Sequence, residues 1–233
     1  MPSRFSLAYQ SQSKPLTASQ YSVTYLLVAL ALLVTVVGVF TGATFALPIL
    51  ASGWIFLLFI AELVLIFTAQ TWSRNPPLNY VLFLTFPFLS GLTITPFLLS
   101  VVGGYVNGAS ILLNATISTM LLTLAAAVFA RTTTMNLNAT IGRFLFQSLI
   151  GLLVFGLLQI FIPALRGSSF EVVLSGVGIV TFSLFLAVDM QRLAASGRFS
   201  NSPFLLALSL YLDIFNLFLY VVRFMLAMSG QRR

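Results

Sequence analysis

Long apolar runs separated by short polar segments dominate the sequence. Seven runs are each long enough to cross a bilayer as a helix, which takes about 20 mostly apolar residues. They cover residues 22–45, 48–73, 78–101, 108–130, 141–163, 170–196 and 203–228. Each run is far too long for a strand. The pattern predicts an all-α integral membrane protein: one domain of seven transmembrane helices at 22–228, between a polar tail at 1–21 and a short basic tail at 229–233.

The chain has few charges and lacks two residue types that much protein chemistry needs. Charged residues make up 6% of it, against about 25% in soluble proteins. It has no cysteine and no histidine, which removes thiolate and imidazole metal sites and every Ser–His or Cys–His nucleophile pair. The only lysine, Lys14, lies in the N-terminal tail, so a retinal Schiff base on a late helix is excluded. We therefore expect no enzyme and no tightly bound cofactor.

The basic residues predict an orientation. The net charge is +7, and in so apolar a chain this excess indicates membrane topology rather than nucleic-acid binding. Seven of the basic residues fall on the side of the N-terminus: Arg4, Lys14, Arg74, Arg131, Arg143, Arg192 and Arg198. Four fall on the other side: Arg166, Arg223, Arg232 and Arg233. The positive-inside rule therefore favours a cytoplasmic N-terminus.

A polar stripe runs along the last predicted helix. Its members are spaced by four, three, four and three residues, and they are Ser209, Asp213, Asn216, Tyr220 and Arg223. This spacing places them on one face of a helix. A helix that is otherwise apolar directs such a face toward other helices, around a polar or wet cavity. The stripe indicates an ion pathway, and the alternative is a hydrogen-bonded seam that only holds the helices together.

Two aspartates lie inside the last two predicted spans. A carboxylate at membrane depth costs several kcal/mol unless it is paired, hydrated or protonated, so it marks a functional site by default. At about 1.5 Å per residue, Asp189 is expected roughly 12 Å and Asp213 roughly 16 Å from the loop that joins their helices. Similar depth on antiparallel neighbours would let the carboxylates touch and share one proton. The alternative for Asp189 is a local pair with Arg192, three residues on.

A third acid, Glu62, lies in the second predicted span, roughly 18 Å from Arg74 at its exit. Calcium prefers carboxylate and carbonyl oxygens, so the three intramembrane acids and Asn216 are candidate ligands if they converge. Glu62 could instead be a protonated, hydrogen-bonded side chain. Arg74 could reach the aspartates as a counter-charge or extend to lipid headgroups. The polar positions expected only to form hydrogen bonds between helices are Ser90, Thr93, Thr95, Asn114, Ser118 and Thr119.

Three segments of the sequence have a recognisable pattern: LALSLYLDIFNLFLYVVR at 206–223, AVDMQRL at 187–193 and RNPPLNYVLFLTFPFLSGLTITP at 74–96. They resemble segments of the Bax inhibitor family, also called the transmembrane Bax inhibitor motif family. The resemblance implies a seven-helix fold whose last helix is central and surrounded by the other six. It also implies calcium leak across a membrane, controlled by pH through an aspartate pair that maps onto Asp189 and Asp213. By the same resemblance, a family arginine maps onto Arg74 and a family acid onto Glu62.

Together these observations predict a monomeric, pH-sensitive calcium leak channel or slow calcium transporter of a bacterial inner membrane, whose partners are calcium, protons and lipid. The predicted pH-sensing residues are Asp189, Asp213 and Arg74. The predicted ion pathway comprises Asp213, Asn216, Glu62, Ser209 and Tyr220. The candidate calcium ligands are Asp189, Asp213 and Glu62. Two alternatives stay open. One is a non-conducting protein that binds a membrane protease complex, as some bacterial members of the family are thought to do. The other is a proton–cation antiporter that uses the same aspartates.

Overall fold

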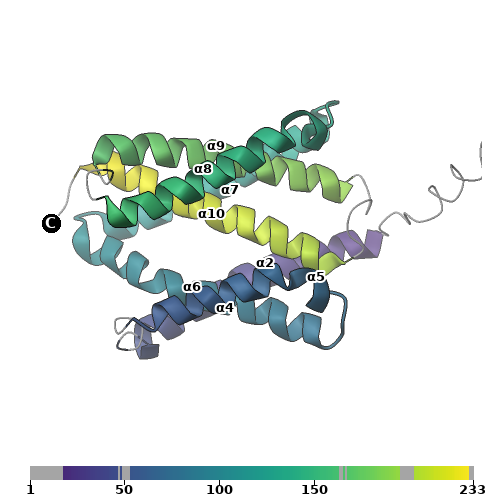
Figure 1. Ribbon diagram of the computed structural model, residues 1–233, viewed down its shortest axis with the longest axis horizontal. Coiled ribbons are helices and arrows are strands. Elements are labelled where there is room, and N and C mark those ends of the chain that lie inside the picture. The colour runs from purple at the N-terminus through teal and green to yellow at the C-terminus, as the bar shows by residue number, and fades with distance from the viewer. Residues whose placement is uncertain are drawn as a thin grey trace, which may run out of the picture.

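Every element in the computed structural model, which describes residues 18–46, 48, 53–162, 165, 167–194 and 202–230, is a helix (Figure 1). The elements are α2 (Ala18–Thr41), the π-helix η1 (Gly42–Ala46), α4 (Ile55–Phe67), α5 (Ala69–Trp72), α6 (Leu78–Gly104), α7 (Gly108–Thr132), α8 (Leu137–Phe161), α9 (Ser168–Ala194) and α10 (Pro203–Ser229). The all-α prediction is confirmed. Helix α2 begins at Ala18, inside the predicted polar tail 1–21, and the part of it that can cross a membrane begins at Ser22. Residues 1–17 and 231–233 of the two predicted tails lie outside the described residues.

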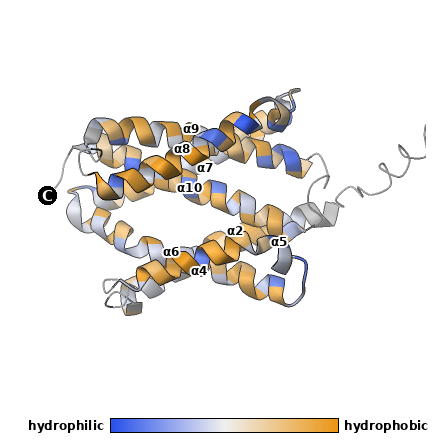
Figure 2. Ribbon diagram, viewed as in Figure 1, coloured by the Kyte–Doolittle hydropathy of each residue, from blue (hydrophilic) through white to orange (hydrophobic). Residues whose placement is uncertain are grey.

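Six of the described helical segments are long and apolar enough to cross a membrane. They are Ser22–Phe45, Leu78–Gly104, Gly108–Thr132, Leu137–Gln159, Ser169–Ala194 and Pro203–Ser229. Most of their residues are apolar (Figure 2), and large side chains on them, such as Phe40 and Val173, are each 66% exposed. Side chains of this kind are stable only against lipid or another apolar surface, since exposed apolar patches of this extent are rare in water. The chain is therefore an integral membrane protein.

The predicted span at 48–73 differs from the other six. It contains α4, an apolar helix of 13 residues in which no residue is buried, and the four-residue helix α5 after Thr68. Thirteen residues rise about 20 Å, which is less than the roughly 30 Å of a hydrocarbon core. A seventh membrane crossing therefore stays a prediction.

Helices α2 and α6 approach each other closely because each has a glycine at the contact. A methyl group added to Gly38 would meet the backbone of Phe88 and Gly91, and one added to Gly91 would meet the backbone of Thr35 and Gly38. Small residues at such crossings let two backbones pack directly, which is how helices associate where lipid removes the hydrophobic driving force. This pair of helices forms one side of the molecule.

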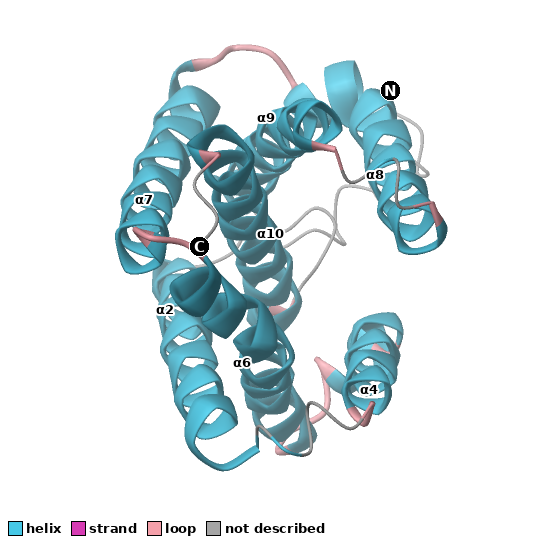
Figure 3. Cartoon of the chain, turned by 90° about the vertical axis from the view of Figure 1, so that its left-hand side faces the viewer, coloured by secondary structure: helices cyan, strands magenta, loops and turns pink. Residues whose placement is uncertain are grey.

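Helix α10 packs against α9, α2, α7 and α6, and it lies in the middle of the end view (Figure 3). It begins with Pro203 in its first turn, a position that suits proline because an amide hydrogen there would have no partner within the helix. Gly230, in the left-handed conformation with φ 58°, follows its last residue. Helices α4 and α8 pack mainly against α6 and α9 respectively, so the prediction that six helices surround the last one also stays open.

Candidate functional site

Asp189 lies on α9, five residues before the helix ends at Ala194, and only 5% of it is exposed. Its Oδ1 atom accepts a hydrogen bond from Arg192 Nη1 at 2.9 Å, which is also an ion pair. Its Oδ2 atom accepts a hydrogen bond from the Ser209 hydroxyl of α10. Arg192 also donates from Nη2 to Asn138 Oδ1 of α8 at 2.5 Å. Asp189 thus links α9 directly to α10 and, through Arg192, to α8, and the alternative of a local pair with Arg192 is confirmed.

Asp213 lies on α10 and is 7% exposed. Its Oδ2 atom is buried, and no described residue forms a hydrogen bond with it. The charged groups that interact with Asp213 electrostatically are Asp189 and Arg192. Buried polar atoms are almost always paired, and an ionised carboxylate in lipid without a partner costs several kcal/mol. An isolated Asp213 therefore carries a proton, unless water or a cation balances its charge.

The two aspartates are neighbours but share no hydrogen bond in the described part of the chain. Asp189 is bonded to Ser209, which comes four residues before Asp213 and so about 6 Å earlier along α10. The register of the two helices thus places Asp189 beside the turn that precedes Asp213. The predicted direct contact between the carboxylates is replaced by an arrangement in which one is paired and the other is not.

The rest of the α10 stripe divides between several roles. Asn216 donates to the carbonyl of Leu212 in its own helix at 2.8 Å. Tyr220 stacks on Phe182 of α9, with ring centroids 5.5 Å apart, and its ring fills the space beside Gly178, where a methyl group would collide with it. In the stretch of α10 beyond Asp213, the Asn216 side chain is therefore bonded to its own helix, and the Tyr220 ring packs against α9.

Glu62 belongs to a second polar cluster. Its Oε1 atom accepts a hydrogen bond from Thr93 Oγ1 of α6 at 2.9 Å. Ser90, also on α6, interacts with both Glu62 and Tyr211, and the Tyr211 hydroxyl lies 2.8 Å from that of Thr35 on α2. The alternative of a hydrogen-bonded glutamic acid is therefore supported for Glu62. Among the described residues, no three acidic side chains gather into one possible metal site, so the three intramembrane acids do not converge in this structure.

Arg74 is exposed and lies near the start of α10. With Asn79, Ser202 and Phe204 it lines a cavity of about 320 Å³. Arg192, rather than Arg74, is the arginine that pairs with Asp189. Sequence spacing alone favoured neither, because both residues are predicted on the same side of the membrane.

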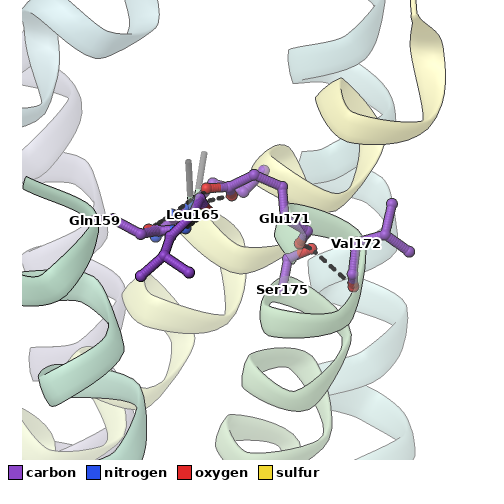
Figure 4. A network of polar contacts seen from close by, with 6 residues as sticks. Gln159, Leu165, Glu171, Val172 and Ser175 are labelled. Atoms are coloured by element: carbon purple, nitrogen blue, oxygen red, sulfur yellow. Dashed lines mark hydrogen bonds and ion pairs between the residues drawn. The ribbon is translucent and has the colours of Figure 1, made fainter. Parts of the chain in front are cut away.

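One polar cluster went unrecognised in the sequence. Arg223, on α10, forms an ion pair with Glu171 on α9, with Nη2 3.1 Å from Oε1, and it donates from Nε to Oε2 at 3.2 Å. Arg223 Nη2 also donates to Gln159 Oε1 of α8 at 2.8 Å. Gln159 Nε2 in turn donates to Glu171 Oε1 at 2.6 Å (Figure 4). A signal was available: the chain has only four acidic residues, and Glu171 is the one that the predicted site leaves unassigned.

Comparisons with known proteins agree with the resemblance carried by the three segments. The family model described as inhibitor of apoptosis-promoting Bax1 matches residues 19–231. An uncharacterized protein of Campylobacter jejuni is 32% identical over 212 residues, covering 89% of this chain and 88% of its own. An uncharacterized protein of Helicobacter pylori J99 is 33% identical over 200 residues, covering 86% and 83%. An uncharacterized membrane protein of Streptococcus pyogenes serotype M1 is 28% identical over 171 residues, covering 70% of each chain.

Proposed function

The chain belongs to the Bax inhibitor family, and we propose that it is a pH-sensitive calcium leak channel or slow calcium transporter of a bacterial inner membrane, with its N-terminus in the cytoplasm. The observation that carries the proposal is the unpaired, buried carboxyl of Asp213, which lies one helical turn beyond the contact between Asp189 and Ser209. An unpaired carboxylate anion is costly in lipid, and a second carboxylate beside it raises that cost. Such a group is suited to hold a proton and to exchange it for a cation.

The charges of this group of residues indicate how pH would act. Arg192 neutralises Asp189, so a protonated Asp213 leaves the interface between α9 and α10 without net charge. When Asp213 loses its proton, one negative charge is uncompensated beside Asp189. Repulsion then separates the helices, or a cation enters and is bound by carboxylate oxygens, which calcium prefers. Calcium flux should therefore be low in acid and rise toward neutral pH.

The other polar residues would serve a pathway that begins at this pair. Ser209 holds Asp189 in place, and Asn216 can turn its amide from the Leu212 carbonyl toward a passing cation. Tyr220 restricts the route farther along α10. Glu62, which is bonded to Thr93 of α6, and Arg74, which lines the cavity near the start of α10, would act in a second conformation and not as the first ligands of the ion.

The test is calcium flux into liposomes that contain purified protein and a calcium-sensitive dye, measured from acidic to neutral pH. Asp213→Asn keeps the shape of the side chain but cannot ionise, so its flux should stay at the acid level at every pH. Asp189→Asn should shift the pH-dependent rise to lower pH, because a neutral residue 189 no longer disfavours a charge on Asp213.

The matched control is Ser183→Ala, which removes a buried hydroxyl on α9 that has no hydrogen-bond partner among the described residues. This variant should behave like the wild type. Unchanged flux and unchanged pH response in both aspartate variants would refute the gating role.

The same carboxyl also favours a proton–cation antiporter, because a proton leaves Asp213 when a cation enters. A pH-sensitive dye inside the liposomes separates the two functions, since only an antiporter moves protons in fixed proportion to calcium. A folded, reconstituted protein that passes no calcium at any pH would instead favour binding of a membrane protease complex, to be tested by co-purification.

A further inference from the structure

The cluster at the far end of α9 and α10 is built around one positive group. The Arg223 guanidinium lies among three acceptor oxygens: Glu171 Oε1 at 3.1 Å, Glu171 Oε2 at 3.2 Å and Gln159 Oε1 at 2.8 Å. Gln159 Nε2 donates to Glu171 Oε1 and, at 3.0 Å, to the Leu165 carbonyl. These two bonds fix the amide (Figure 4), and its oxygen accepts the hydrogen bond from the guanidinium. Three oxygens on two helices thus converge on a single cationic position.

This cluster lies at the opposite end of the helix pair from the aspartates. Glu171 and Asp189 are both on α9 and are separated by 18 residues, or about 27 Å along the helix. That distance is close to the roughly 30 Å thickness of a hydrocarbon core. The side chains of Arg223 and Glu171 are 31% and 21% exposed, whereas that of Asp189 is 6% exposed. The cluster is therefore more exposed than the aspartate pair, and its end of the two helices is the candidate second mouth of the proposed pathway.

The cluster is also continuous with the polar stripe of α10. Arg223 comes ten residues after Asp213, with Asn216 and Tyr220 between them on the same face. The guanidinium carbon of Arg223 lies 5.8 Å from the centre of the Tyr220 ring, and this ring packs against α9 through Phe182. Arg223 and Tyr220 therefore lie against each other at this end of the stripe.

The oxygens around Arg223 are those that a hard cation prefers, namely a carboxylate and an amide carbonyl. A guanidinium cannot lose its charge in a protein, so it competes with a cation for these oxygens at every pH. We propose that Glu171 and Gln159 form a divalent-cation site at this mouth, and that Arg223 occupies it as a tethered positive plug. The proposal rests on the proposed function, because it describes the second end of the same pathway.

A purely structural role is the competing explanation, since the same contacts join α8, α9 and α10. The two explanations predict different consequences of removing the arginine. If Arg223 only holds the helices together, its removal loosens their packing, and added calcium does not change that packing. A plug that is removed leaves Glu171 and Gln159 as an open cation site, which calcium can fill.

The chain has no cysteine, so a single introduced thiol gives an unambiguous signal. In Asn216→Cys, the thiol lies behind Tyr220 and Arg223, and a charged, membrane-impermeant thiol reagent added to each side in turn should label it slowly. Adding Arg223→Gln should raise the labelling rate from one side by about tenfold, within the range of typical coupling effects. Arg223→Lys keeps the positive charge, and should stay close to the slow rate.

The effect of calcium on labelling then distinguishes a cation site from a contact that only holds the helices together. Millimolar calcium should slow the labelling of Asn216→Cys/Arg223→Gln, and should have no effect once Glu171→Gln is added. Arg143→Gln, which removes an exposed arginine of α8, controls for the loss of one positive charge. Labelling unchanged by Arg223→Gln, or accelerated but insensitive to calcium, would overturn the proposal. Because labelling does not require flux, its failure is distinct from a failure of the wild-type protein to conduct calcium.

Discussion

The two ends of the α9–α10 pair each combine an acid of α9 with an arginine, but in different proportions. At one end, Asp189 is neutralised by Arg192 of its own helix, and Asp213 remains as a second, unpaired carboxyl. At the other end, Glu171 meets Arg223 of α10, and an amide of α8 completes the cluster. The first end has two carboxyls for one arginine, and the second has one for one. The first end is therefore suited to respond to pH. At the second end, the position of Arg223 decides whether the acceptor oxygens are free for a cation.

The largest effect should come from replacing, one at a time, the two partners of the ion pair between Arg223 and Glu171. Arg223→Gln and Glu171→Gln remove the same ion pair, so a structural tie would make the two variants alike. If Arg223 is a plug, Arg223→Gln should raise calcium flux about tenfold, while Glu171→Gln should leave it near or below the wild-type level because the cation site is lost. Liposome flux at neutral pH measures the contrast, and equal changes in both variants would show that the cluster only ties the helices together.

A smaller effect is expected from Arg192→Gln, at the end that contains Asp189 and Asp213. This change leaves two carboxyls with no arginine beside them, so releasing a proton creates more uncompensated negative charge. The rise of calcium flux should therefore shift to higher pH, with the acid level unchanged. The pH profile of flux in liposomes reports the shift, and Arg143→Gln should show none. A shift to lower pH would mean that Arg192 does not act on the aspartates through its charge.

The smallest effect is expected from Ser209→Ala. The hydroxyl of Ser209 donates to Asp189, and a hydrogen bond to a charged group contributes about 1.5–3 kcal/mol. Its loss should lower the unfolding temperature in detergent and decrease the steepness of the pH response, because Asp189 is held less firmly beside Asp213. Ser183→Ala should change neither property. An unaltered unfolding temperature in Ser209→Ala would argue that the contact is not maintained.

The sequence predicted the positions of the helices well, because long apolar runs and their flanking proline, glycine and asparagine residues are local signals. One such signal was missed: the side chain of Asn136 accepts a hydrogen bond from the Ala139 amide, so α8 begins at Leu137, four residues before the predicted start. The predicted span at 48–73 was harder, since hydropathy measures the apolar run and not how much of it forms one helix.

The sequence predicted which candidate residues share a helical face, but not which contacts they make with other helices. The stripe on α10 identifies Asp213, because spacing fixes which residues share a helical face. Spacing does not fix the register between helices, and a difference of one turn decides whether Asp189 meets Asp213 or Ser209. The same limit explains why Glu62 was considered with the aspartates, although it bonds to α6, and why Glu171 was not matched with Arg223, 52 residues later in the chain.

The claim that Asp213 holds the proton that closes the pathway can be tested most directly by infrared spectroscopy of the reconstituted protein. A protonated carboxyl has a carbonyl band that disappears when the group ionises. The difference between wild type and Asp213→Asn isolates the band of this one residue. We expect this band to be lost as pH rises, with the same midpoint as the increase in calcium flux. A band that persists unchanged in Asp213→Asn, or a midpoint far from that of the flux, would contradict the claim.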